Sequence, residues 1–234
     1  MASKSVISFL LIASAAFASG SFFDYESANP LLDASDYLAD YYNYNSNPHA
    51  RVTRGADKKM CCGDGTIQIE ESDKEMAKKC MTENGIEMPP PGDHKHGPGG
   101  PGGPGGKDFK EHMKKKACAC ECMGKATNMI DDDGYTKTAF IDEVVTKAPA
   151  ELKDFAKTVA TDCVTNMNAK AKEIGKVEAN GKQCNPAFGM TVLCTIANME
   201  TECPAAQQVK SDDCDKRRGF FKMIKEKVAK GEEM

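Results

Sequence analysis

Eleven cysteines constrain this chain more than any other feature of its sequence. All of them lie between residues 61 and 214, and the first 60 residues contain none. Cysteines pair into stable disulfides mainly in proteins that enter an oxidising compartment. Because eleven is an odd number, at most five bridges can form within one chain, and one thiol is left over.

The N-terminal residues have the pattern of a secretory signal peptide. Lys4 supplies a positive charge, residues 6–17 form an apolar run, and Ala-Phe-Ala at 16–18 offers the small residues that signal peptidase requires. The alternative is an uncleaved anchor, which the shortness of the apolar run disfavours. We therefore expect residues 1–18 to be removed, with cleavage after Ala18 or Gly20, and the mature protein to be secreted and extracellular.

Composition divides the remainder into an extension, a helical domain and an insert. Residues 19–58 are acidic, dotted with aromatic residues and free of cysteine, which is typical of a flexible extension that builds no core of its own. Residues 59–234 contain every cysteine and are expected to form one domain. Within it, residues 89–106 consist largely of Pro and Gly, so we expect a disordered insert there.

Helical spacing of apolar residues dominates the cysteine-rich region. Apolar side chains recur at three- and four-residue steps, whereas no segment alternates convincingly as a strand does. We expect helices over residues 67–84, 107–129, 149–174, 185–202 and 211–230, with Asn180-Gly181 as a turn. A further helix is expected to open at Thr136 or Thr138 and to carry the apolar residues between 140 and 145. The expected fold is all-α: a compact, disulfide-stapled bundle of about six to seven helices around an apolar cavity.

Charge and histidine placement exclude several classes of function. The net charge of −4 and the lack of a strongly basic face argue against nucleic-acid binding. The four histidines, His49, His94, His96 and His112, lie in the extension, in the insert or just after it, and no nucleophile–base pattern accompanies them. We expect no catalytic residue, no cofactor and no enzymatic activity.

Two short motifs resemble metal ligands. His94 and His96 form an HxH pair, but the insert around them gives no fixed geometry and no further ligands. Cys118, Cys120 and Cys122 could be read as zinc ligands, although disulfide formation is the expected use of cysteine in a secreted chain. We therefore expect no metal site.

The order of the gaps between the cysteines resembles a known family. From Cys118 onward the spacing is C-x3-C-x40-C-x20-C-x9-C-x8-C-P-x9-C, with Pro204 directly after the sixth cysteine of the run, and Cys80 precedes it. This pattern resembles the insect odorant-binding proteins of the Plus-C group over roughly residues 60–230. The Pro/Gly insert and the aromatic extension depart from the family and leave the pocket entrance undefined.

The resemblance implies a disulfide framework. It implies the bridges Cys80–Cys122, Cys118–Cys194 and Cys163–Cys203, with Cys184 and Cys214 tied to Cys61 and Cys62. A competing register pairs Cys118 with Cys184 and Cys163 with Cys194; the position of Pro204 favours the first. Cys120 points away from the helix face that holds Cys118 and Cys122, so we expect it to be the unpaired thiol. The protein is then expected to be a monomer or a Cys120-linked dimer.

The resemblance also implies a function in olfaction. The chain would carry a small hydrophobic ligand, such as an odorant, a pheromone or a lipid-like molecule, and would act on a membrane chemoreceptor only indirectly. The alternative is a secreted structural or interaction protein of salivary, reproductive or cuticular origin on the same scaffold. Inward-facing apolar positions supply the candidate lining of the ligand site: Met123, Met129, Phe140, Val144, Phe155, Val159, Met167, Phe188, Ile196, Met199, Phe220 and Ile224.

Overall fold

The computed structural model of the protein describes residues 61–63, 71–86 and 107–230, which are mostly helical. The signal peptide, the N-terminal extension and the Pro/Gly insert of the sequence prediction lie outside the described residues. The expected all-α, disulfide-stapled fold is confirmed. The α-helices of these ranges are α3 (Glu71–Glu83), α4 (Lys107–Ala126), α5 (Ala139–Lys147), α6 (Lys153–Ile174), α7 (Ala187–Thr201) and α8 (Asp212–Lys230), and the short 3-10 helices η2 (Ala150–Leu152) and η3 (Ala205–Gln207) precede α6 and α8.

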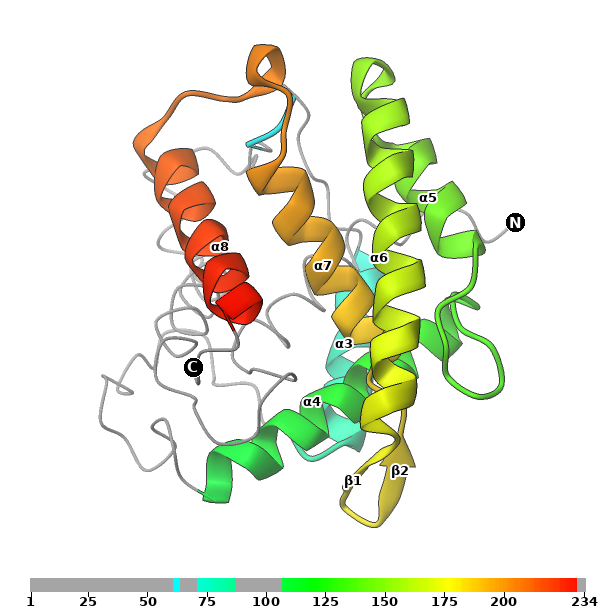
Figure 1. Ribbon diagram of the computed structural model, residues 1–234. Coiled ribbons are helices and arrows are strands. Elements are labelled where there is room, and N and C mark those ends of the chain that lie inside the picture. Colours follow the sequence, from blue (N-terminus) through cyan, green and yellow to red (C-terminus); the bar gives the residue numbers. More distant parts are fainter. Residues whose placement is uncertain (1–60, 64–70, 87–106, 231–234) are drawn as a thin grey trace.

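The long helices α6 and α7 lie side by side and run in opposite directions (Figure 1). α5 packs on α6, and α8 packs on α7, so that each of the two has a further helix beside it. α4 crosses the lower part of the molecule in Figure 1, where it contacts α3, α7 and a small hairpin. This arrangement gives α7 three neighbouring helices, which is why its sequence is apolar on nearly every side.

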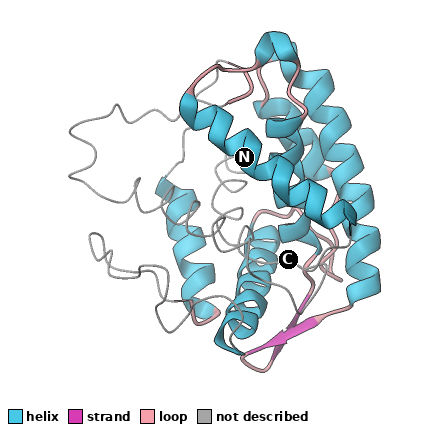
Figure 2. Cartoon of the chain, turned by 60° about the vertical axis from the view of Figure 1, so that its left-hand side comes forward, coloured by secondary structure: helices cyan, strands magenta, loops and turns pink. Residues whose placement is uncertain are grey.

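A two-stranded hairpin joins α6 to α7 and corrects the expectation that no strand is present. β1 (Val177–Ala179) pairs with β2 (Lys182–Cys184) in antiparallel register, as the magenta arrows of Figure 2 show. The turn residues Asn180 and Gly181 have φ angles of 51° and 71°, as a two-residue hairpin turn requires. Strands of three residues are too short to show an alternating pattern, so the Asn-Gly pair was the only signal that the sequence carried.

The hairpin tip also completes the end of α3. The last carbonyl groups of a helix have no partner within the helix and need donors from elsewhere. The side-chain amide of Asn180 donates to the carbonyl oxygen of Asn84 at 3.0 Å, and Nζ of Lys182 donates to that of Glu83 at 3.0 Å. The positive charge of Lys182 also suits the negative end of the helix dipole. Segments almost one hundred residues apart in the sequence are thereby held together.

Five disulfides connect these elements. Cys80–Cys122 joins α3 to α4, Cys118–Cys184 joins α4 to β2, and Cys163–Cys194 joins α6 to α7. Cys62–Cys203 and Cys61–Cys214 hold residues 61 and 62 against the region from the end of α7 to α8. The resemblance implied Cys80–Cys122 and a tie of Cys214 to Cys61 or Cys62, and both are confirmed.

The implied bridge between Cys163 and Cys203 is wrong, because Cys163 pairs with Cys194. α6 and α7 run antiparallel on either side of the hairpin, so the middle of α6 lies opposite the middle of α7 (Figure 1). Cys203 lies beyond the last residue of α7 and cannot take that place. Pro204, which had favoured the wrong pairing, caps η3, so it marks the end of α7 and says nothing about the partner of Cys203.

The implied bridge between Cys118 and Cys194 is wrong as well. Cys118 pairs with Cys184, the last residue of β2, because the hairpin packs directly on α4. The expected tie of Cys184 to Cys61 or Cys62 therefore does not form. The competing register considered from the sequence is the one that the structure contains for these two bridges.

The core is centred where α4 meets α7. Phe188 of α7 and Phe140 of α5 are fully buried and meet edge to face, with their ring centroids 6.0 Å apart. Gly124 of α4 faces Phe188 so closely that a Cβ atom there would lie 3.0 Å from Cγ of that ring and 2.9 Å from Cγ2 of Ile130. Only the absence of a side chain at Gly124 allows the two helices to approach this far.

We predict that Gly124→Ala destabilises the protein by about 1–3 kcal/mol, because the added methyl group must displace buried side chains. Gly219→Ala is the matched control, since no atom lies within 4 Å of a Cβ placed there in α8. The control should be neutral or stabilising by about 0.5–1 kcal/mol through helix propensity. Guanidinium unfolding followed by circular dichroism measures both changes, and an unfolding free energy of Gly124→Ala equal to that of wild type would contradict the prediction.

Candidate ligand-binding site

The structure places the predicted lining residues at different depths. The buried ones are Met123, Met129, Phe140, Val144, Val159 and Phe188. The half-buried ones are Phe155, Met167, Ile196, Met199 and Phe220, and the side chain of Ile224 lies outside the described residues. The buried members can only serve as a floor, whereas the half-buried members keep surface that a ligand could cover.

The predicted lining is also divided among separate clusters. Most of its buried members share one core cluster, against which Met167, Ile196 and Met199 pack. Phe155 belongs to a second cluster with Leu152 near the Cys62–Cys203 bridge. Phe220 packs on Phe221 of the same helix, with ring centroids 5.4 Å apart. The predicted residues therefore do not line a single common site.

Three side chains of α7 form the apolar edge of the main core. Leu193, Ile196 and Met199 follow one another at three-residue steps, are half-buried, and pack against the core cluster. Helical geometry places residues at this spacing along one side of the helix. We call these three residues the α7 stripe. Sequence analysis missed Leu193, although its spacing from Ile196 was the signal that could have found it.

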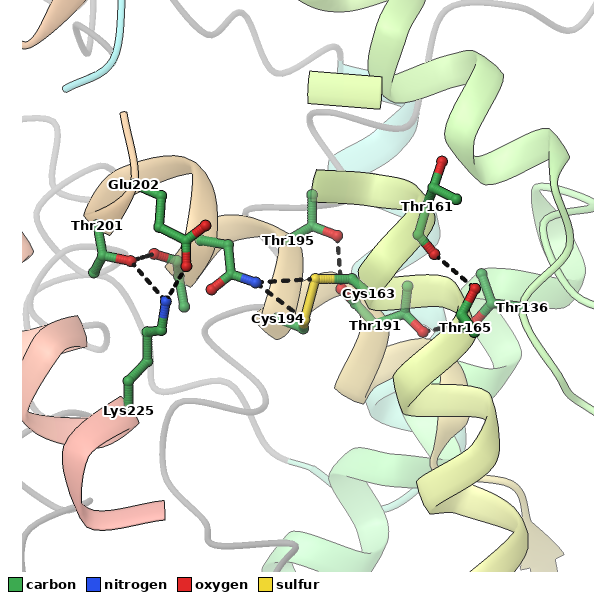
Figure 3. Close-up of a disulfide and its surroundings, with 12 residues drawn as sticks. Thr136, Thr161, Cys163, Thr165, Thr191, Cys194, Thr195, Thr201, Glu202 and Lys225 are labelled. Atoms are coloured by element: carbon green, nitrogen blue, oxygen red, sulfur yellow. Dashed lines mark hydrogen bonds and ion pairs between the residues drawn. A yellow bond between two sulfur atoms is a disulfide. The ribbon is translucent and has the colours of Figure 1, made fainter. Parts of the chain in front are cut away.

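A second side of α7 is fastened to α6. The Cys163–Cys194 bridge crosses between the two helices (Figure 3). The side-chain amide of Asn198 donates to Sγ of Cys163 at 3.4 Å. A buried hydroxyl pair lies on the same side, where Oγ1 of Thr191 is 3.1 Å from Oγ1 of Thr136. Because these polar groups bond to one another, they are already satisfied by the protein itself.

Charged side chains hold α7 to α8. Glu200 of α7 forms a buried ion pair with Arg217 of α8, and Lys225 pairs with Glu202 and donates to Oγ1 of Thr201 at 3.3 Å (Figure 3 shows the contacts of Lys225). Burial raises the pKa of the Glu200 carboxyl, although Arg217 and Arg218 oppose the shift. Its Oε2 atom has no hydrogen-bond partner among the described residues. Glu200 lies four residues after Ile196 and therefore on the same side of the helix as the α7 stripe, so the stripe borders α8 and keeps only part of its apolar surface accessible.

The one free cysteine, Cys120, is buried on α4, as the sequence predicted for the unpaired thiol. Burial raises the pKa of this thiol, and the charge of nearby Lys116 opposes the shift only partly. Burial likewise lowers the pKa of Lys116 from 10.5 to about 8. The thiol therefore stays protonated at neutral pH. This burial argues against a Cys120-linked dimer, because a partner chain could not reach the sulfur.

Residues 61–63, 71–86 and 107–230 contain no group of three or more His, Cys, Asp or Glu side chains arranged to hold a metal ion. The HxH pair at His94 and His96 lies outside the described residues. None of the described helices combines the length and the apolar character that crossing a membrane requires.

Comparison with known proteins yields one similarity of moderate extent. Over 99 residues the chain is 31% identical to general odorant-binding protein 68 of Anopheles gambiae. The aligned part covers 42% of this chain and 45% of that relative, so the chain spans just under half of the relative's length. No protein-family model and no solved structure matches the chain. The similarity supports an odorant-binding-protein-like family.

We predict that Cys120 resists thiol reagents in the folded protein. A neutral, buried thiol is a poor nucleophile, because the thiolate is the reactive form. The oxidised protein should react with dithionitrobenzoate very slowly in native buffer and should release one equivalent per chain once guanidinium unfolds it without a reductant. Rapid stoichiometric labelling in native buffer would show that the thiol is accessible and would restore the disulfide-linked dimer as an alternative.

Proposed function

We propose that this chain is a secreted carrier of small hydrophobic molecules and belongs to the Plus-C type of odorant-binding protein. The observation that carries the proposal is the α7 stripe, in which Leu193, Ile196 and Met199 join the core on one side and keep accessible surface on the other. An apolar surface that borders a rigid core suits a ligand that is mostly apolar.

Two further observations support the proposal. The five disulfides suit a protein that works in an oxidising, extracellular environment. The similarity to a protein named as a general odorant-binding protein points to the same class of ligand. Secretion, the ligand class and the Plus-C type are all part of what we propose.

In the proposed site, the ligand meets the α7 stripe, which packs against the core cluster that contains the buried rings of Phe140 and Phe188. The residue Met167 of α6, which packs on the same cluster, extends the lining. Methionine is flexible and polarisable, so Met167 and Met199 can adapt to ligands of different shape. Affinity would come mainly from the removal of apolar surface from water, worth about 25 cal/mol per Å².

We predict that Ile196→Asp weakens binding of the fluorescent apolar probe N-phenyl-1-naphthylamine by about tenfold or more. The substitution replaces an apolar contact worth about 1.5 kcal/mol or more with a charge that a bound ligand would have to desolvate. Titration of the probe into delipidated protein gives its dissociation constant. Displacement by long-chain alcohols and aldehydes then tests whether the site accepts odorant-like molecules.

The matched control is Ile141→Asp, which makes the same change at a half-buried isoleucine on α5. This variant should bind the probe as wild type does, and thermal unfolding should show that both variants are folded. If no apolar compound displaces the probe saturably, the carrier function is wrong. If both variants bind the probe with wild-type affinity, the carrier function stands but the site lies away from α7.

A further inference from the structure

The α7 stripe is next to the place where the N-terminal part of the chain joins the described structure. Cys61 is bonded to Cys214 in α8, and Cys62 is bonded to Cys203 just after α7. The backbone of Cys61 is fixed further, because its carbonyl oxygen accepts hydrogen bonds from the backbone of Val209 at 3.1 Å and from the guanidinium of Arg218 at 3.2 Å. The point at which the preceding chain joins the described structure is therefore fixed beside the C-terminal end of α7 and the N-terminal end of α8.

The N-terminal extension can reach the α7 stripe from this anchor. Its aromatic part spans residues 22–44 and ends 17 residues before Cys61. A stretch of that length can extend up to about 60 Å. The stripe is only about 9 Å long, since its outer members are six helical residues apart. Met199, its last member, comes four residues before Cys203 in the sequence, so length does not limit the contact.

The chemistry of residues 22–44 matches an apolar surface. Five of the six tyrosines of the whole chain lie in this segment, together with two phenylalanines and three leucines. Aromatic side chains gain a large contact area for little loss of conformational freedom when they dock. Those residues are Phe22, Phe23, Tyr25, Leu31, Leu32, Tyr37, Leu38, Tyr41, Tyr42 and Tyr44.

The charge of residues 22–44 matches α8, the helix packed beside α7. The segment carries five Asp or Glu and no Lys or Arg. The whole of α8 carries seven Lys or Arg against four Asp or Glu, a net charge of +3, and three of these cations are held in ion pairs within the structure. Lys216 and Lys222 are exposed on this helix. Opposite charges on two surfaces favour their encounter and fix their orientation.

We propose that residues 22–44 of this chain dock on the α7 stripe, with their carboxylates near the exposed Lys216 and Lys222 of α8. The occupant is thus the protein's own N-terminal segment. The docking goes beyond the carrier function and holds for the ligand-free protein. A ligand that uses the stripe would have to share it with this segment or displace it, so the N-terminal extension would set the affinity for the ligand.

Zero-length cross-linking of the ligand-free, full-length mature protein tests the docking. Carbodiimide joins a carboxylate to an amine only where the two are in contact, and peptide mass spectrometry identifies the joined residues. We expect cross-links from Asp33, Asp36 or Asp40 to Lys216 or Lys222. Lys157, which is exposed on α6, is the control lysine and should form none with the segment.

Methionine oxidation measures whether the stripe is covered. We expect peroxide to oxidise Met199 several-fold faster in the variant Tyr37→Ser, Tyr41→Ser, Tyr42→Ser than in wild type. The charge-reversal variant Lys216→Glu, Lys222→Glu should have the same effect, because it removes the attraction of α8 for the segment. Met76, half-buried on α3, should keep its wild-type rate in both variants.

The cross-linking experiment also distinguishes the chain's own N-terminal segment from a second copy of the chain as the occupant of the α7 stripe. Mixing isotopically light and heavy protein before cross-linking separates contacts within a chain from contacts between chains. Links found only between light and heavy chains would assign the stripe to a second copy and overturn the proposal. An equal Met199 rate in wild type and both variants, with no cross-link to α8, would also overturn it. Because no ligand is present, neither result depends on whether the protein is a carrier.

Discussion

The arrangement of the helices depends on two disulfides that start one helical turn apart on α4. Cys118 holds the hairpin and Cys122 holds α3, so a single helix face positions elements from both directions along the chain. The hairpin in turn caps α3 through Asn180 and places α7 antiparallel to α6. Bridges of this kind typically contribute about 2–4 kcal/mol each, which is a large share of the stability of a small domain.

The candidate site lies on α7, and the contacts of this helix with its neighbours decide which part of it is accessible. Its N-terminal half is buried on all sides, and its C-terminal half is held by a disulfide to α6 and by ion pairs to α8. These contacts leave the α7 stripe as an apolar margin of the core. The proposed ligand and the proposed docking of residues 22–44 both depend on this margin, because its apolar side chains are only partly covered and burying the remainder against a partner is favourable.

The burial of the free thiol also protects the disulfide framework. A reactive thiolate near five disulfides could exchange with them and scramble the framework. Cys120 is kept neutral by burial and is kept out of contact with solvent. Its position on α4, between the two cysteines that form bridges, is therefore compatible with one defined set of disulfides.

The sequence by itself determined the helical class and the approximate range of each described helix, because apolar periodicity reflects which face of each helix is buried. It also determined that Cys120 stays unpaired, since helical spacing turns this residue away from Cys118 and Cys122. The tertiary structure alone decided the partners of Cys118 and Cys163, because pairing depends on which segments lie opposite each other in space. The tertiary structure also decided which apolar residues are fully buried and which, as in the α7 stripe, stay partly accessible. The sequence shows that a residue is apolar, but the packing of neighbouring helices decides how much of its surface remains exposed.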